Sequence, residues 1–137
     1  MILAFLTTFT IVQNLDFGEI ALMRNHQKSE LTVKTSGEII SSGAIYIFTP
    51  GHAAELLLQS SSPQTELQIS ALVTAPMGSA FASNTFNLID LNYPSSVVTD
   101  SSGMATITLG GTIQSSGNGV TYQDSHYQTS IAITVTY

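Results

Sequence analysis

The sequence predicts an all-β chain, an antiparallel sandwich or barrel of about seven to nine short strands with little or no helix. Apolar and polar side chains alternate with a period of two along most of the chain. Between these stretches, turns rich in Gly, Pro, Ser and Asp recur roughly every 8–16 residues. No linker or change of composition divides the 137 residues. We therefore expect one domain over residues 14–137, preceded by an apolar strand at residues 1–13.

The first predicted element, residues 1–13 (MILAFLTTFTIVQ), is largely apolar and carries no charge. In an extended strand its odd-numbered and even-numbered side chains lie on opposite faces. One hypothesis is that this segment leaves its own domain as a donor strand, with the larger odd row facing the partner. The alternatives are an ordinary first strand over residues 7–13 of its own domain, or a remnant of a leader. The odd row consists of Met1, Leu3, Phe5, Thr7, Phe9 and Ile11.

The later elements follow in order from the same alternation. The apolar run Gly51–Ser61 fits either a short helix or a buried strand, and its flanking Pro and Ser residues limit its length, so we interpret it as a strand. The segment TFNLIDLNY, residues 85–93, is predicted to place Phe86, Leu88 and Asp90 on one face. The other predicted strands are Glu30–Thr35, Ala44–Thr49, Thr65–Val73, Met104–Ile113 and Tyr127–Tyr137.

Charge and composition exclude several classes of partner. The net charge is −6, and the three cations, Arg24, Lys28 and Lys34, form no basic stripe, so we expect no binding to nucleic acid or to an anionic membrane surface. No apolar run approaches the roughly 18 residues of a membrane span, so we expect no membrane insertion. Charged residues make up only 9%, whereas Ser and Thr supply about a quarter of the chain. Polarity carried by hydroxyls is common in secreted β proteins.

No constellation of side chains indicates catalysis or a cofactor. His26, His52 and His126 are far apart and match no metal-binding spacing, and the chain has no cysteine. Asp90 and Asp100 are the candidates for a calcium site, but the regular carboxylate spacing of a calcium loop is missing. We prefer to interpret them as turn or strand-end carboxylates that accept backbone hydrogen bonds. We therefore expect no enzyme, no metal and no cofactor.

Three motifs occur in a fixed order: NLDFGEI near the start, DSSGMATITLGGTI later, and HYQTSIAITVTY at the end. Together they resemble a family of secreted bacterial β-sandwich domains of unknown function, which is similar to spore-coat-protein-U-like and archaic chaperone–usher pilins. The resemblance covers Asn14 to Tyr137. It departs at His126, where the family usually has Gly, and in lacking the disulfide common in related pilins. The matching residues are Leu15, Phe17, Gly18, Gly103, Gly110, Gly111, Tyr127, Ile133, Val135 and Tyr137.

The resemblance implies an immunoglobulin-like sandwich that is exported to the cell surface, with its leader already removed, and that has a structural or adhesive role. In such pilins the sandwich lacks one strand, and a neighbour's terminal segment fills the resulting apolar groove. The implied partners are copies of the chain in a filament and a periplasmic chaperone before assembly. The alternative function is a stand-alone extracellular binding or adhesion module, for glycans, with tyrosine-bearing loops as the platform.

Overall fold

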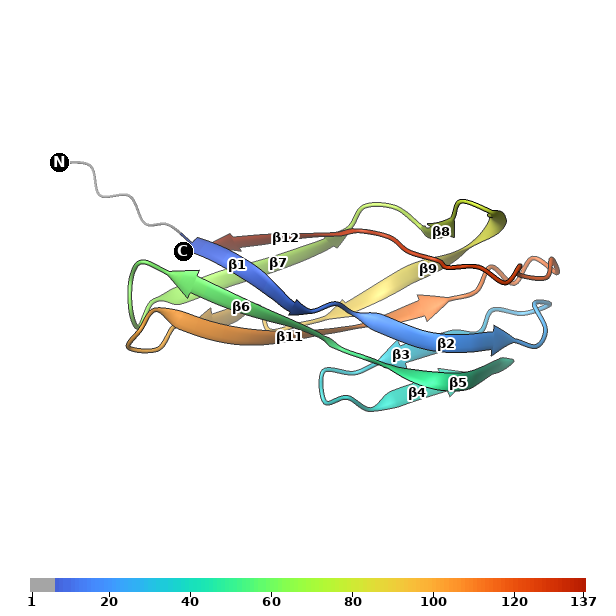
Figure 1. Cartoon of the computed structure of the whole chain (residues 1–137), viewed down its shortest axis with the longest axis horizontal. Coiled ribbons are helices and arrows are strands. Elements are labelled where there is room, and N and C mark those ends of the chain that lie inside the picture. The colour runs from blue at the N-terminus through green and yellow to red at the C-terminus, as the bar shows by residue number, and fades with distance from the viewer. Residues whose placement is uncertain (1–6) are drawn as a thin grey trace.

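The computed structural model describes residues 7–137, which form twelve β-strands (Figure 1). The all-β prediction is confirmed, and every named strand pair in these residues is antiparallel. The bounds of the strands are β1 (Thr7–Gln13), β2 (Asp16–Leu22), β3 (Glu30–Val33), β4 (Ile39–Ser42), β5 (Ile45–His52), β6 (Ala54–Ser60), β7 (Glu66–Val73), β8 (Met77–Ser79), β9 (Ala82–Asn92), β10 (Ser96–Val98), β11 (Met104–Gln114) and β12 (Ile131–Thr136). The strands outnumber the expected seven to nine for two reasons. Two long extended segments are each interrupted where they bend, which gives β1 and β2, and β5 and β6, and the short strands β8 and β10 add to the count.

The strands form an elongated two-layer sandwich in which one long arm changes layers. At one end, β1, β6 and β11 face a second sheet in the order β10-β7-β12, and at the other end β9, β11, β3 and β4 face the pair β2–β5. The arm β1–β2 stays paired with the arm β5–β6 throughout. The crossing point lies near Ala53, whose carbonyl accepts a hydrogen bond from the Gln13 side chain at 2.9 Å. Residues 7–137 contain no helix long and apolar enough to cross a membrane.

Two apolar clusters fill the sandwich, one at each end. The first packs Phe17 of β2 against the sheet that contains β3, β9 and β11. The second packs β6 and β11 against β7 and involves Leu56, Leu58 and Leu67, which are almost fully buried. In both clusters the buried side chains alternate with exposed ones, as the period-2 pattern predicted.

A bulge in β9 changes the predicted face of one carboxylate. Leu88 lies opposite Ile113, but the next pair along the ladder is Asp90 opposite Thr112, so Ile89 is an extra residue. The extra residue reverses the alternation. The expected common face of Phe86, Leu88 and Asp90 is therefore wrong: Phe86 and Leu88 are buried, whereas Asp90 is exposed.

Two of the motif glycines allow close backbone approach. Gly18 has a φ of +84°, and a Cβ atom there would lie 2.1 Å from the Thr49 carbonyl oxygen. At Gly110 a Cβ atom would lie 2.3 Å from the Val33 carbonyl oxygen. Any other residue would push β2 away from β5, or β11 away from β3, so these glycines hold the strand pairs together.

Candidate strand-binding groove

A groove of about 1290 Å³ separates the β1–β2 arm from the segment that follows β11. One wall runs from Ile11 through Leu22, and the other runs from Thr121 to Ile133. The floor is apolar because it is formed by Leu56, Leu109 and other core side chains. The groove is therefore an opening into the apolar interior between the two layers.

Unpaired strand edges border this groove on both sides. Among the described residues, β1 pairs only with β6, β2 only with β5, and β12 only with β7. Each of these strands therefore has a second edge whose backbone groups are not used in a ladder. The inward side chains beside these edges are only partly covered: Ile11 is 53% exposed, and Ile20, Ile131 and Ile133 are half-buried. The geometry is that of a sandwich with room for one more strand.

The wall opposite β2 is an irregular segment rather than a strand. The predicted strand Tyr127–Tyr137 begins in the structure only at Ile131, and residues 121–130 form a single bridge, between Gln128 and Gly78. Two backbone hydrogen bonds, of 3.0 and 2.8 Å, make this bridge. The Ser79 and Ser125 hydroxyls also form a hydrogen bond. These contacts tie the segment to β8 and leave its other side towards β2.

Three aromatic rings support this wall. Phe86 lies against Tyr122 and Tyr127, with ring centroids 4.3 and 5.2 Å apart, and the two tyrosines are 5.8 Å apart. The Tyr122 hydroxyl donates to the Thr85 carbonyl and accepts from the Ser116 amide. Burial raises the pKa of the Tyr127 phenol, and the nearby Tyr122 and Asp124 also raise it, against a lowering by the hydrogen bond to the Gln123 carbonyl. The cluster gives this half of the groove a fixed apolar surface.

The charged residues of the groove are carboxylates and histidines. Asp16, Glu19 and Asp124 line it, and the lining contains no Lys or Arg. The His52 Nε2 atom lies 3.8 Å from Asp16 Oδ2, and both side chains are solvent-exposed. An uncharged or basic strand would therefore meet no electrostatic repulsion in the groove, whereas an acidic strand would be disfavoured.

The structure places part of the predicted donor row in the chain's own sheet. Thr7, Phe9 and Ile11 lie in β1, opposite Ser60, Leu58 and Leu56 of β6. This is the ordinary first strand that the sequence left open as an alternative. Phe9 and Ile11 face inward, on the side of the buried Leu58 and Leu56. The other members of the row, Met1, Leu3 and Phe5, lie outside the described residues.

The family-motif residues concentrate around the groove and its supports. Five of them line it: Leu15, Phe17, Gly18, Tyr127 and Ile133. Val135 lies on the same face of β12 as Ile133, and Tyr137 is exposed just after that strand. The three remaining motif residues do not line the groove and instead allow close backbone packing, in β11 or in the turn before it: Gly103, Gly110 and Gly111.

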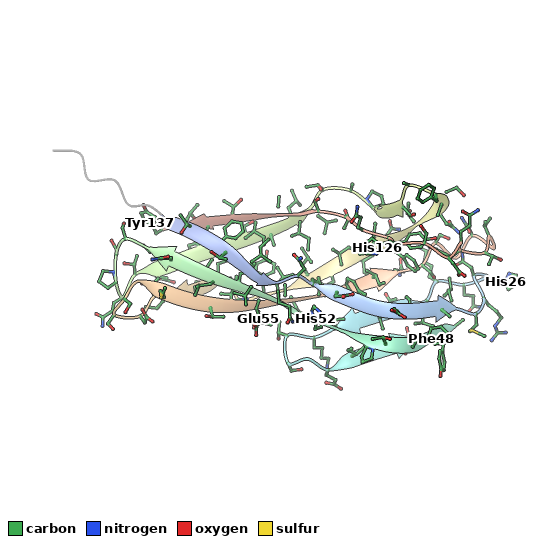
Figure 2. All side chains as sticks on the ribbon, in the orientation of Figure 1. His26, Phe48, His52, Glu55, His126 and Tyr137 are labelled. Atoms are coloured by element: carbon green, nitrogen blue, oxygen red, sulfur yellow. The ribbon has the colours of Figure 1, made fainter. Side chains whose placement is uncertain are left out.

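The histidines and carboxylates do not converge on a metal site. Among residues 7–137 no group of three His, Cys, Asp or Glu residues could hold a metal ion, and Figure 2 shows the labelled histidines on separate elements. Asp100 accepts hydrogen bonds from the Ser102 and Met104 amides, as expected for a turn carboxylate. Asp90 lies opposite Thr112, eight residues further along β11 than Met104, which places the two carboxylates roughly 25 Å apart.

Sequence reasoning missed the wall formed by residues 121–130. Residues 121–126 gave no strand signal, and residues 127–130 were predicted as the start of the last strand, which begins only at Ile131. The pairing that leaves β2 with one open edge is non-local. One signal was available, because Tyr122 and Tyr127 are large apolar side chains in an otherwise polar stretch. Such residues need a surface to pack on, and here that surface is Phe86.

Comparison with known proteins gives a family without an assigned activity. Residues 7–137 match the family described as a domain of unknown function (DUF4402). No curated protein and no solved structure matches the chain. The family match spans both layers of the sandwich and both walls of the groove. The chain therefore belongs to the DUF4402 family of domains of unknown function.

Proposed function

We propose that this protein is the structural subunit of a bacterial cell-surface filament, in which an apolar strand from one copy fills the groove of the next. The observation that carries the proposal is the groove itself, which has an apolar floor, the unpaired edges of β1 and β2 along one side and the unpaired edge of β12 along part of the other. A strand added there would gain backbone hydrogen bonds along these edges and would cover half-buried side chains such as Ile20 and Ile133. Its chemistry is therefore that of β-strand addition.

The proposed donor is the six-residue stretch ahead of β1, Met1–Leu6 (MILAFL), of a second copy. It carries no charge and has large apolar side chains, which suits an apolar groove with carboxylates on its rim. Extended, six residues span about 20 Å, close to the length of the seven-residue strand β2. The stretch can therefore cover the half of the groove that lies between β2 and residues 121–130.

The direction of the chain favours a filament over a closed pair. Thr7 lies opposite Ser60, at the end of the sandwich where β1 begins and β12 ends (Figure 1). Leu22, which lines the groove, is the last residue of β2, and β2 ends at the opposite end of the sandwich (Figure 1). A donor that leaves one end of a copy and enters the other end of its neighbour makes a head-to-tail contact, and repetition of such contacts generates a filament.

Composition supports a surface location within this proposal. The chain has few charged residues and many hydroxyl side chains. Its motifs resemble exported β-sandwich domains that are similar to pilins. A filament subunit built in this way needs no catalytic residue, and its partners would be copies of itself and, before assembly, a chaperone that shields the groove.

A disulfide-capture experiment tests the donor and its direction together. Because the native chain has no cysteine, two substitutions create a unique pair. Leu3→Cys places a thiol in the donor, and Ile20→Cys places one in the β2 half of the groove. We expect the double variant to form a ladder of disulfide-linked oligomers under mild oxidation, and negative-stain micrographs of the wild type to show filaments.

The matched control replaces Ile20→Cys by Leu72→Cys, because Leu72 is exposed on β7 outside the groove. This control should form no disulfide-linked ladder, although its donor and its groove are both intact. A ladder of equal yield with Leu72→Cys would indicate random collision and would contradict the proposal. Absence of a ladder in the Leu3→Cys, Ile20→Cys variant would contradict the proposal too. In a third variant, which carries Leu3→Cys with Ile133→Cys of β12, disulfide capture as closed dimers alone would also contradict it.

A second candidate function rests on one surface feature. Tyr46 and Phe48 project from the outer face of β5, are mostly exposed, and have ring centroids 5.0 Å apart. Exposed aromatic faces can stack on sugar rings, which is the chemistry expected of a stand-alone glycan-binding module. Glycan binding that is lost in Tyr46→Ala, together with micrographs free of filaments, would favour this candidate.

A further inference from the structure

The two cations without an ion pair among the described residues lie in one loop at one end of the molecule. This loop, residues 23–29, joins β2 to β3 and contains Arg24, His26 and Lys28, all exposed. Figure 2 shows His26 at the extreme end of the sandwich. The remaining cation, Lys34, is paired with Glu38 at 3.2 Å in a loop away from both ends. We call the end formed by residues 23–29 the cationic end.

The cationic loop is held in place by a buried side chain. Asn25 is 5% exposed, and its Nδ2 group lies 2.9 Å from Ser116 Oγ and 2.8 Å from the Val120 carbonyl oxygen. Its Oδ1 atom accepts from the Gly117 amide at 2.9 Å. Because Asn25 lies between Arg24 and Lys28 in the sequence, these bonds fix the backbone on which both cations are carried. The charges are thus presented by a rigid platform.

The opposite end carries acidic groups and no described cation. It is formed by the loops at residues 61–65 and 99–103, which flank Glu66 and contain Asp100 (Figure 1). The Gln64 amide donates to the Asp100 carbonyl at 3.0 Å, which joins the two loops. Asp100 Oδ1 accepts from the Ser102 and Met104 amides. This acidic end is also rigid, and it is the end from which β1 begins.

We infer that the acidic end of one copy docks on the cationic end of the next copy, beside the groove that receives the donor strand. The inference rests on the proposed function, because head-to-tail donation brings these two ends together. The cationic loop contains Arg24 and Lys28 and no carboxylate, and Glu30, which begins β3 directly after the loop, accepts a hydrogen bond from the Gln114 side chain at 3.2 Å. Glu66 and Asp100 give the other end two negative charges, so the contact is attractive.

Exposed apolar side chains accompany the charges at both ends. Phe81, in the turn between β8 and β9, is 85% exposed, and Met23 lies at the start of the cationic loop with most of its surface in solvent. At the acidic end Val98 is exposed and lies opposite Glu66 in the β10–β7 ladder. Contact between copies would bury these side chains, which gives the charged interface an apolar component.

Charge reversal with rescue tests this docking. One variant carries Arg24→Glu and Lys28→Glu, a second carries Glu66→Lys and Asp100→Asn, and a third combines all four changes. Asp100→Asn keeps the side-chain oxygen that accepts the turn hydrogen bonds. The rate of oligomer growth, followed by light scattering at low ionic strength, should fall about tenfold in each of the first two variants and recover in the third.

The matched control is Lys34→Glu, which makes the same change of charge away from both ends and should leave the growth rate unchanged. High salt should reduce the difference between wild type and the first variant. If the first variant does not fold by circular dichroism, Arg24→Gln with Lys28→Gln takes its place, with a smaller expected reduction in rate.

The outcomes separate this inference from the proposed function. Wild-type growth and Leu3–Ile20 capture with no effect of end charges would overturn the docking and leave strand donation intact. If the variant with all four substitutions does not recover the wild-type growth rate, the docking is also overturned, because attraction between the two ends is then not the cause of the loss. Absence of both growth and capture in the wild type would overturn the proposed function and the docking with it.

Discussion

Two openings between the layers of the sandwich, among the described residues, differ in how their strand edges are covered. The opening between β7 and β9 measures about 290 Å³, and the one between the β1–β2 arm and the C-terminal segment measures about 1290 Å³. At the smaller opening the Tyr93 hydroxyl accepts the Ala71 amide hydrogen at 3.0 Å, so a side chain substitutes for a neighbouring strand. On β2 the Asp16 side chain accepts the Gly18 amide hydrogen at 2.8 Å, but among the described residues no side chain from another element bonds to the backbone of β2. An edge left open while another is blocked indicates a place for a partner strand.

The largest expected effect is on the free energy of unfolding, and it compares a buried side chain with a half-buried side chain of the same apolar cluster. Leu67 of β7 is 0% exposed, whereas Ile133 of β12 lines the groove and is half-buried. Leu67→Ala should lower the free energy of unfolding by about 3 kcal/mol, and Ile133→Ala by about 1 kcal/mol, because less contact is lost. Urea unfolding of both variants measures the difference. Equal losses would mean that the groove is covered in solution.

The next effect tests the blocked edge. Tyr93→Phe removes the hydroxyl that accepts the Ala71 amide and should cost about 1 kcal/mol of stability. Hydrogen exchange at Ala71 should accelerate, since its amide loses its partner. Tyr46→Phe is the control, because Tyr46 is exposed on the outer face of β5, and it should change stability by less than about 0.5 kcal/mol. Unchanged exchange at Ala71 in Tyr93→Phe would show that the edge is protected by other means.

Sequence reasoning found the strands but could not find the openings. Alternation located β3, β7 and β11 because their inward residues, such as Leu31 and Leu67, recur every second position. It misplaced Asp90, because a single extra residue at Ile89 reverses the face and leaves no local signal. Which strands pair is set by contacts between distant residues, so neither the open edge of β2 nor the Tyr93–Ala71 hydrogen bond follows from periodicity.

Residues 1–13 also show that local alternation does not predict which strands pair. Their uncharged alternation fitted both a donor strand and an ordinary first strand, and only the ladder to β6 assigns Thr7–Gln13 to the chain's own sheet. Phe9 and Ile11 of the odd row lie opposite the buried Leu58 and Leu56 of the same chain, and the expected contact of this row with a partner's groove stays a prediction. The alternation therefore divides the strand into two opposite rows of side chains, whereas the strand with which it pairs depends on tertiary structure.

The smallest expected effect is a change of stability at alkaline pH, and it concerns Tyr127, which lines the larger groove. The pKa of Tyr127 is raised above the ordinary value of 10.0, first by burial and then by Tyr122 and Asp124. Below pH 10 the phenol is neutral in both the folded and the unfolded protein, so it adds no pH dependence. As the pH rises above 10 the unfolded chain ionises first, and stability falls until the pH has passed the folded pKa. Thermal unfolding from pH 8 to 11 should therefore show an alkaline loss that is smaller in Tyr127→Phe than in wild type.

Strand addition sharpens this prediction, because Tyr127 lines the groove that the donor would fill. A bound strand excludes water from the ring, and further desolvation raises the pKa of a phenol. The phenolate absorbance of Tyr127, taken as the difference between wild type and Tyr127→Phe, should therefore develop at higher pH in the disulfide-linked oligomer than in the monomer. A shift to lower pH in the oligomer would place water or a cation beside Tyr127 and would argue against an apolar strand in the groove.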